Sequence, residues 1–148
     1  MRTTFITKPS DVNRKWYLID ASDEILGRLA CKISDILRGK NKSIFVFNHD
    51  VGDNVIIINS SKIKVTGKKM KNKIYRHHSG YPGGVKDIAL QDMLIRKPEY
   101  VLRHAIKGML PKNNLSHMIL KKLYIYKDGN YNQTAQKPIF IKLKTNKY

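Results

Sequence analysis

The stretch YRHHSGYPGGVKD, residues 75–87, holds the residue types in this chain that could do chemistry. Histidines bind metal ions and transfer protons, and glycine-rich loops let backbone amides surround a phosphate. Successive side chains of a strand point to opposite faces, so His77 and His78 cannot easily bind one metal ion. The three glycines do not follow the G-x-G-x-x-G spacing of dinucleotide-binding loops. We therefore expect neither a metal site nor a cofactor site in this stretch.

A second segment, GKNKS at residues 39–43, has part of a phosphate-binding pattern. A Walker A loop needs glycine where Ser34 stands and serine or threonine where Asn41 stands, so the pattern fails twice. A catalytic triad is not expected either, because acids are few and no G-x-S-x-G elbow occurs. The chain is not expected to be an enzyme or to have a small-molecule substrate. An α/β enzyme that handles phosphoryl groups stays open as an alternative.

The charge of the chain points to a polyanionic partner. Its 148 residues include 29 Lys and Arg against 11 Asp and Glu, which gives a net charge of +18. The surplus positive charges repel one another in a compact state, and a nucleic acid would neutralise them. A membrane partner is not expected, because no basic amphipathic helix, acylation site or apolar run of about 18 residues is present. The single cysteine, Cys31, indicates a reducing compartment and excludes a disulfide framework.

One helix is expected over residues 24–39. Ser22 and Asp23 are plausible N-terminal caps, and Gly39 stands where helices commonly end. The apolar residues fall at helical spacing, namely Leu26, Leu29, Ile33, Ile36 and Leu37.

Two further helical segments are expected within residues 90–110, separated near Pro98. The second should bury a stripe of apolar residues, namely Val101, Leu102, Ala105, Ile106 and Met109.

Four segments have the composition of strands, the third more weakly than the others: residues 15–20, 53–61, 72–78 and 121–129. The run at 53–61 is continuously apolar, which is typical of a strand covered on both faces in a parallel sheet. The apolar segment 43–48 fits a strand or a loop equally well. Strands that alternate with helices predict an α/β fold with a mainly parallel sheet. We divide the chain into an N-terminal arm (1–14), one α/β domain (15–128) and a basic C-terminal extension (129–148).

Cations and glycines cluster as a folded RNA requires. RNA brings phosphates into close quarters, so a protein bound there needs Lys and Arg together with small residues that permit close approach. GKNK, TGKKMKNKIYR and HHSGYPGGVK supply both. Four lysines between residues 68 and 73 would repel one another without an anion.

Several of these motifs resemble one known family. WYLIDASDEILGRLACKISDILRGKNK, GDNVIIINSSKIKVTGKK, RHHSGYPGGVK, AIKGMLPKN and AQKP are similar, in order and spacing, to the bacterial-type universal large-subunit ribosomal protein thirteen family. The resemblance extends from about Trp16 to Pro138. It implies a three-layer α/β/α domain around a four-stranded parallel sheet. It also implies a non-enzymatic component that binds large-subunit ribosomal RNA early in assembly and touches neighbouring ribosomal proteins.

Charge and the resemblance together give the expected RNA-binding residues: Arg28, Arg38, Lys40, Lys42, Lys68, Lys69, Lys71, Lys73, Arg76, His78, Ser79, Gly80, Tyr81, Gly83, Gly84, Lys107, Lys112 and Lys137. The resemblance also includes Gly108, Met109, Leu110 and Pro111, of which Met109 and Leu110 fit a core equally well. The chain departs from the family pattern at residues 115–117, where Leu-Ser-His replaces Leu-Gly-Arg and removes one cation.

The expected function is therefore that of a structural constituent of the large ribosomal subunit. It would act through charge neutralisation and shape fit, with little base-specific readout. The expected location is the ribosome in the cytoplasm, with an organellar ribosome left open. Regulation through binding of messenger RNA outside the ribosome is a further alternative.

Overall fold

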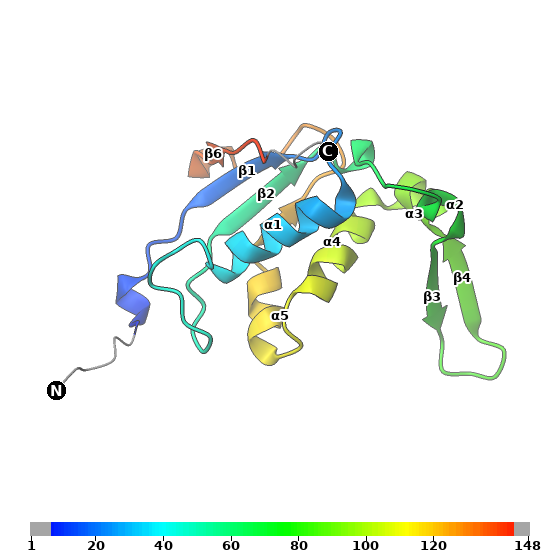
Figure 1. The fold of residues 1–148 in the computed structure, drawn as a ribbon, viewed down its shortest axis with the longest axis horizontal. Helices are drawn as coiled ribbons and strands as arrows, with labels where there is room; N and C mark the ends of the chain where they lie inside the picture. Colours follow the sequence, from blue (N-terminus) through cyan, green and yellow to red (C-terminus); the bar gives the residue numbers. More distant parts are fainter. Residues whose placement is uncertain (1–6, 144–148) are drawn as a thin grey trace.

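A four-stranded parallel sheet in the order β5-β2-β1-β6 runs through the protein (Figure 1). The computed structural model describes residues 7–143, so part of each expected arm, residues 1–6 and 144–148, lies outside the described residues. The strands are β1 (Trp16–Asp20), β2 (Asn54–Ile58), β5 (Leu123–Ile125) and β6 (Ile139–Phe140). β2 lies between β1 and β5 and has three fully buried residues in succession, as its continuous apolar sequence predicted. The α/β class and the four-stranded parallel sheet are confirmed.

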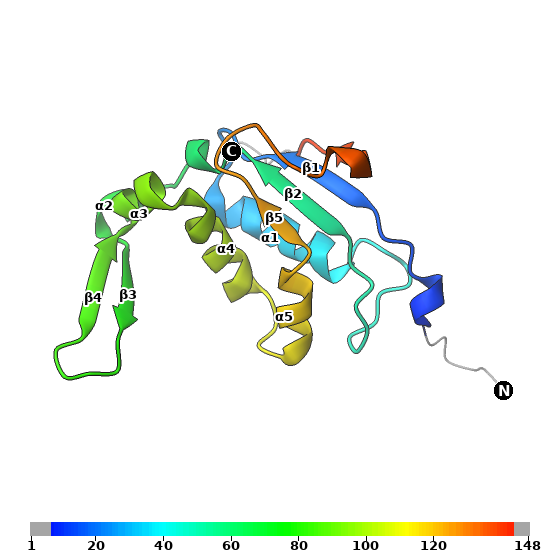
Figure 2. The same cartoon turned by 180° about the vertical axis from the view of Figure 1, so that it is seen from behind.

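Three helices cover one face of this sheet (Figures 1 and 2): α1 (Leu26–Arg38), α4 (Pro98–Met109) and α5 (Asn114–Leu120). The core lies between them and the sheet. Ile19 and Ile57 from the strands, Leu29 and Ile33 from α1, and Ile106 from α4 belong to it and have no exposed surface. The periodicity of the sequence correctly predicted α1 and α4, including the break at Pro98.

Two aromatic side chains stack on the opposite face of the sheet. The rings of Trp16 in β1 and Tyr124 in β5 stack with centroids 5.5 Å apart. Because β2 lies between these strands, the two rings meet above it, and Ile56 on that face has no exposed surface. Of the two helical layers that the resemblance implied, the described residues form the one made by α1, α4 and α5.

Two local expectations were wrong. The residue that precedes α1 is Ile25, which makes no capping hydrogen bond with its side chain, so neither Ser22 nor Asp23 stands at the cap position. The Ser22 hydroxyl donates to Oδ1 of Asp20 at 2.8 Å. Met109 is 41% exposed, and Leu110, 4% exposed, occupies the core in its place, because α4 ends at Met109. Gly39 ends α1 with a φ of 78°, as expected.

A two-stranded antiparallel hairpin, β3 (Ile74–His78) and β4 (Val85–Ala89), projects from one end of the molecule (Figures 1 and 2). Two short helices, α2 (Lys69–Asn72) and α3 (Leu90–Arg96), flank it in the chain. Residues 72–78 therefore contain a strand, but that strand lies outside the parallel sheet. Three 3₁₀ helices complete the described elements: η1 (Pro9–Asp11), η2 (Ser60–Lys62) and η3 (Thr134–Gln136).

The two ends of the described chain take part in the fold. Thr7, in the segment expected as an N-terminal arm, is buried and donates a hydrogen bond to the carbonyl of Ile44 at 3.0 Å. β6, in the segment expected as a C-terminal extension, pairs with β1 through Tyr17–Ile139 and Leu18–Phe140. The segment 43–48, which the sequence left open, is a loop.

Candidate nucleic-acid interface

The loop at the tip of the hairpin, residues 79–84, is shaped by its glycines. Gly80 and Gly83 have φ of 91° and 71°, in the left-handed region that glycine reaches without strain. Gly84 has no space for a side chain, since a Cβ there would lie 2.8 Å from the carbonyl oxygen of Tyr81 and would meet Oγ of Ser79. The geometry of the turn thus accounts for all three glycines without a ligand. It also leaves Tyr81 77% exposed at the tip.

The strands of the hairpin carry charged side chains in a fixed register. Arg76 donates two hydrogen bonds to Asp87, from Nε to Oδ1 at 2.9 Å and from Nη2 to Oδ2 at 3.1 Å. Donation by Arg76 lowers the pKa of the Asp87 carboxyl. His77 lies opposite Lys86 in the register. Nδ1 of His78 accepts a hydrogen bond from the Gly80 amide at 2.9 Å. This histidine therefore has a structural role in the turn.

Aromatic contacts hold the base of the hairpin against α4. The ring of Tyr75 meets those of Tyr100 and His104 at centroid distances of 6.2 and 5.5 Å. Burial raises the pKa of the Tyr75 hydroxyl, with the nearby Tyr100 adding to the effect. The hairpin is thereby tied at one end and exposed along the rest of its length.

Residues 68–73, here called the lysine segment, precede the hairpin. Lys68, Lys69, Lys71 and Lys73 are all exposed, and within the described chain none of them forms an ion pair with a carboxylate. The ammonium of Lys73 lies 5.3 Å from the centre of the Tyr75 ring. Four like charges in six residues without neutralising partners make this segment the densest free positive charge among the described residues.

At the far end of α1, the expected cations are already engaged. Arg38 lies over the ring of Phe45, 5.8 Å from its centre. Lys40 forms an exposed ion pair with Asp35 at 3.1 Å. Both side chains remain accessible enough to contact a polyanion, but each has a partner within the protein.

Lys42 is enclosed by acceptors. Its ammonium donates to the carbonyls of Asn13 and Val51, at 2.9 and 3.0 Å, and to Oδ1 of Asp53 at 2.6 Å. An ammonium has three N–H donors, so all of them are used. We therefore assign Lys42 a structural role and leave it out of the interface proposed below.

The buried Lys122 belongs to the same charged neighbourhood. It donates to Asp50 and to the carbonyl of Leu37. Burial lowers its pKa, and the hydrogen bond that it donates to Asp50 opposes that shift. These contacts tie β5 to the end of α1 and to the loop before β2.

The remaining predicted residues are spread over the surface. Lys107 is exposed in the last turn of α4, and Lys112 is exposed in the turn before α5. Gly108 lies between Lys107 and the exposed Met109, and Pro111 is half-buried. Lys137 is exposed after η3, on the C-terminal segment that leads into β6.

The structure brings part of the predicted set together. Arg28, in the first turn of α1, shares a pocket with Lys69 and Lys73, and the hairpin follows directly in the chain. Arg38 and Lys40 lie elsewhere, because ten residues of α1 place Arg38 about 15 Å along the helix from Arg28. The most coherent candidate surface therefore comprises the lysine segment, the hairpin and the pocket beside them.

Two exposed residues were missed in the sequence. Phe47 is 80% exposed and packs edge-on against Phe45, at a centroid distance of 5.2 Å. Its apolar segment 43–48 gave no sign of exposure. Lys86 adds a cation to the hairpin, and only the pairing of β3 with β4 reveals its place opposite His77.

Within residues 7–143, no group of three or more His, Cys, Asp or Glu side chains is placed to hold a metal ion. None of the helices described is long and apolar enough to cross a membrane.

Fold and surface together define a basic α/β protein with a projecting hairpin and a lysine-rich segment beside it. A model of the family described as ribosomal protein L13 matches residues 14–132. The chain belongs to this family, as its motifs indicated. That membership confirms the prediction of a ribosomal protein rather than an enzyme.

Individual relatives are similar over nearly their whole length. The chain is 50% identical over 141 residues to the large ribosomal subunit protein uL13 of Lachnoclostridium phytofermentans, which covers 95% of this chain and 98% of that protein. It is 49% identical over 138 residues to the protein of the same name from Levilactobacillus brevis, and the match covers 93% of this chain and 94% of that protein. It is 48% identical over 141 residues to the protein of the same name from Finegoldia magna, and that match covers 95% of this chain and 99% of the relative.

Proposed function

We propose that this protein is a structural component of the large ribosomal subunit and binds large-subunit ribosomal RNA through the lysine segment and the hairpin. The relatives that it matches over almost their full length are named as proteins of that subunit. Neighbouring ribosomal proteins are its expected protein contacts, and the ribosome is its expected location.

The observation that carries this proposal is the unpaired charge of the lysine segment. Four exposed lysines lie within six residues, and no described carboxylate pairs with them. Like charges at this density repel one another, and a phosphate backbone would relieve the repulsion and release its own counterions on binding.

The hairpin extends this charged surface away from the body of the protein (Figure 2). Its tip exposes Tyr81, whose ring can stack on a base, and its strands carry Arg76 and Lys86. A slender element of this kind can enter between RNA helices, where a globular surface cannot.

Binding of purified protein to transcribed large-subunit ribosomal RNA, measured over a range of KCl concentrations, tests the proposal. A triple variant, Lys68→Gln/Lys69→Gln/Lys71→Gln, should lower the slope of log K against log salt by about 2–3, since each phosphate contact contributes about 0.7–0.9.

A matched control removes three exposed lysines elsewhere, in the variant Lys121→Gln/Lys127→Gln/Lys142→Gln. It should change the slope much less. Equal slopes for the two triple variants would mean that net charge alone binds the RNA, and that the lysine segment is not the interface.

A further inference from the structure

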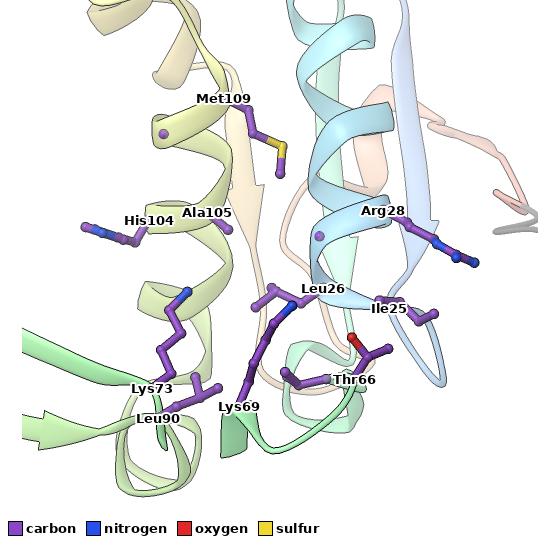
Figure 3. Close-up of a pocket in the computed structure, with 13 residues that line it drawn as sticks. Ile25, Leu26, Arg28, Thr66, Lys69, Lys73, Leu90, His104, Ala105 and Met109 are labelled. Atoms are coloured by element: carbon purple, nitrogen blue, oxygen red, sulfur yellow. The ribbon is translucent and has the colours of Figure 1, made fainter. Parts of the chain in front are cut away.

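A pocket of about 600 Å³ opens between the start of α1 and the end of α4, beside the lysine segment (Figure 3). Its wall is mainly apolar and includes Leu26 from α1, Leu90 from α3, and Ala105 and Met109 from α4. Volumes of this size hold small organic groups. The side chains of residues 7–143 leave this space open.

Two cations lie at the mouth of the pocket. Figure 3 shows the side chains of Lys69 and Lys73 running toward the space between the two helices, whereas His104 points away from it. Neither lysine forms an ion pair with a carboxylate in the part of the chain that the structure describes. An apolar cavity with unpaired positive charge at its rim complements a group that is flat and apolar on its faces and anionic at its edge.

Two glycines within helices line the same pocket, Gly27 in α1 and Gly108 in α4. Neither has a positive φ, and a Cβ at either position would meet no atom within 4 Å. Glycine inside a helix is destabilising relative to alanine. Nothing in the packing of the described chain requires either glycine, in contrast to Gly84 in the hairpin. Their effect is to widen the pocket from two sides.

We propose that this pocket receives one unstacked base of the ribosomal RNA, while Lys69 and Lys73 neutralise the phosphates on either side of it. This inference rests on the proposed function, because it takes the bound RNA for granted. Folded RNA presents unstacked bases in its loops and bulges, and proteins bind such bases in apolar sites. The heterocycle has the apolar faces that Leu26, Leu90 and Met109 can cover, and its phosphates supply the charge that the rim lacks.

The test fills the pocket without touching a cation. In Gly108→Leu the new side chain occupies the cavity, and affinity for transcribed large-subunit ribosomal RNA should fall about tenfold, the order expected for one lost base contact. The salt slope should stay unchanged, because every phosphate contact remains. The melting temperature should not fall, since a Cβ meets nothing at this position and glycine is a poor helix residue.

Two controls accompany this variant. Gly108→Ala adds only a methyl group to the pocket and should lose less affinity than Gly108→Leu. Gln91→Leu places the same apolar side chain at an exposed position of α3 that does not line the pocket, and it should bind RNA as the wild type does. If Gly108→Leu binds RNA as tightly as wild type, or if Gln91→Leu loses as much affinity, the proposal is overturned.

A measurement on the unmodified protein does not depend on any variant folding. Ultraviolet crosslinking of the wild-type complex followed by tryptic digestion should yield a nucleotide attached to residues 104–107 or 108–112, which include the pocket residues Ala105 and Met109. If another polypeptide protects these peptides in assembled subunits and no nucleotide is attached to them, the pocket is assigned to a neighbouring protein instead. Crosslinks confined to the hairpin would refute the base-binding pocket and leave the proposed function intact. A wild-type protein that does not bind the RNA at all would refute both.

Discussion

The ammonium of Lys42 lies 2.6 Å from Oδ1 of Asp53, a carboxylate with no exposed surface. Oδ1 also accepts the backbone amide of Lys15 at 2.8 Å, whereas Oδ2 is buried without a hydrogen-bond partner in the described structure. A buried carboxylate that lacks one partner already depends strongly on those that remain. Lys42 thus joins the loop after α1 to the start of β2, in a chain whose other lysines mostly face solvent.

Lys42→Met should therefore destabilise the fold by about 2–3 kcal/mol, since it leaves the charge of Asp53 buried and uncompensated. Urea unfolding at neutral pH measures this loss. The salt slope of RNA binding should be that of the wild type, because the ammonium of Lys42 has no donor left for a phosphate.

Lys40→Gln is the matched comparison, because Lys40 also pairs with an aspartate but does so in solvent, opposite Asp35. Its loss should be below about 0.5 kcal/mol. Similar losses for the two variants would show that Lys42 is not a special structural cation. Adding Asp53→Asn to Lys42→Met should recover part of the stability, as coupling between the two side chains requires.

Asp20, at the end of β1, predicts a dependence of stability on pH. Partial burial raises the pKa of its carboxyl, but hydrogen bonds from the Ser22 amide (2.9 Å), the Ser22 hydroxyl (2.8 Å) and Asn59 Nδ2 (3.0 Å) outweigh that effect. The net pKa lies below the ordinary value of 3.8. The folded state therefore holds its proton less tightly than the unfolded state. The stabilisation is complete well above pH 3.8 and is lost as the pH falls through the lower pKa of the folded state.

Asp20→Asn should accordingly reduce the free energy of unfolding at neutral pH by about 0.5–1 kcal/mol, after allowance for solvent screening. At an acid pH below the pKa that this carboxyl has in the folded state, where the wild-type side chain is also neutral, the two proteins should be equally stable. Urea titrations at both pH values decide the matter. A difference that persists unchanged in acid would show that shape, and not ionisation, gives Asp20 its effect.

Local patterns in the sequence predicted the elements whose apolar residues form a continuous run or recur at helical spacing, and the break that a proline imposes. The run around Ile56 gave β2, the spacing from Leu26 to Leu37 gave α1, and Pro98 gave the break before α4. Each of these signals acts over neighbouring residues, so one sequence suffices to read it. β6 lacked such a signal, because its two residues are held by pairing with β1 and remain half exposed.

Prediction of the candidate surface depended more on tertiary contacts than prediction of the helices and strands did. Lys42 and Lys40 are two residues apart and look alike in sequence, yet only Lys42 meets Asp53, because the loop between α1 and β2 folds back on itself. Likewise Gly27 and Gly108 look like isolated helix defects, and only the packing of α1 beside α4 shows that they line one pocket.

Tyr81 is expected to contribute to RNA binding through its ring. It is 77% exposed at the tip of the hairpin, so packing within the described residues buries little of its ring. Tyr81→Ala should weaken binding to the ribosomal RNA by about tenfold, the order of one lost stacking contact. Tyr81→Phe keeps the ring and should bind normally, and both variants should melt with the wild type. If the phenylalanine variant is as weak as the alanine variant, the hydroxyl and not the ring makes the contact.

The ion pair with Asp87 reduces the positive charge that Arg76 in the hairpin presents to RNA. Both side chains are exposed, and the two hydrogen bonds between them occupy the guanidinium edge that would otherwise face a phosphate. Asp87→Asn should release Arg76 and tighten RNA binding, with the slope of log K against log salt steeper by about 0.7–0.9, the contribution of one added phosphate contact.

The control is Asp11→Asn in η1, which makes the same charge change at the end of the molecule opposite the hairpin (Figure 1). Because that site is remote from the candidate surface, its slope should stay at the wild-type value. Weaker binding of Asp87→Asn would show that the intact ion pair, through the shape it gives the hairpin, is what the RNA requires.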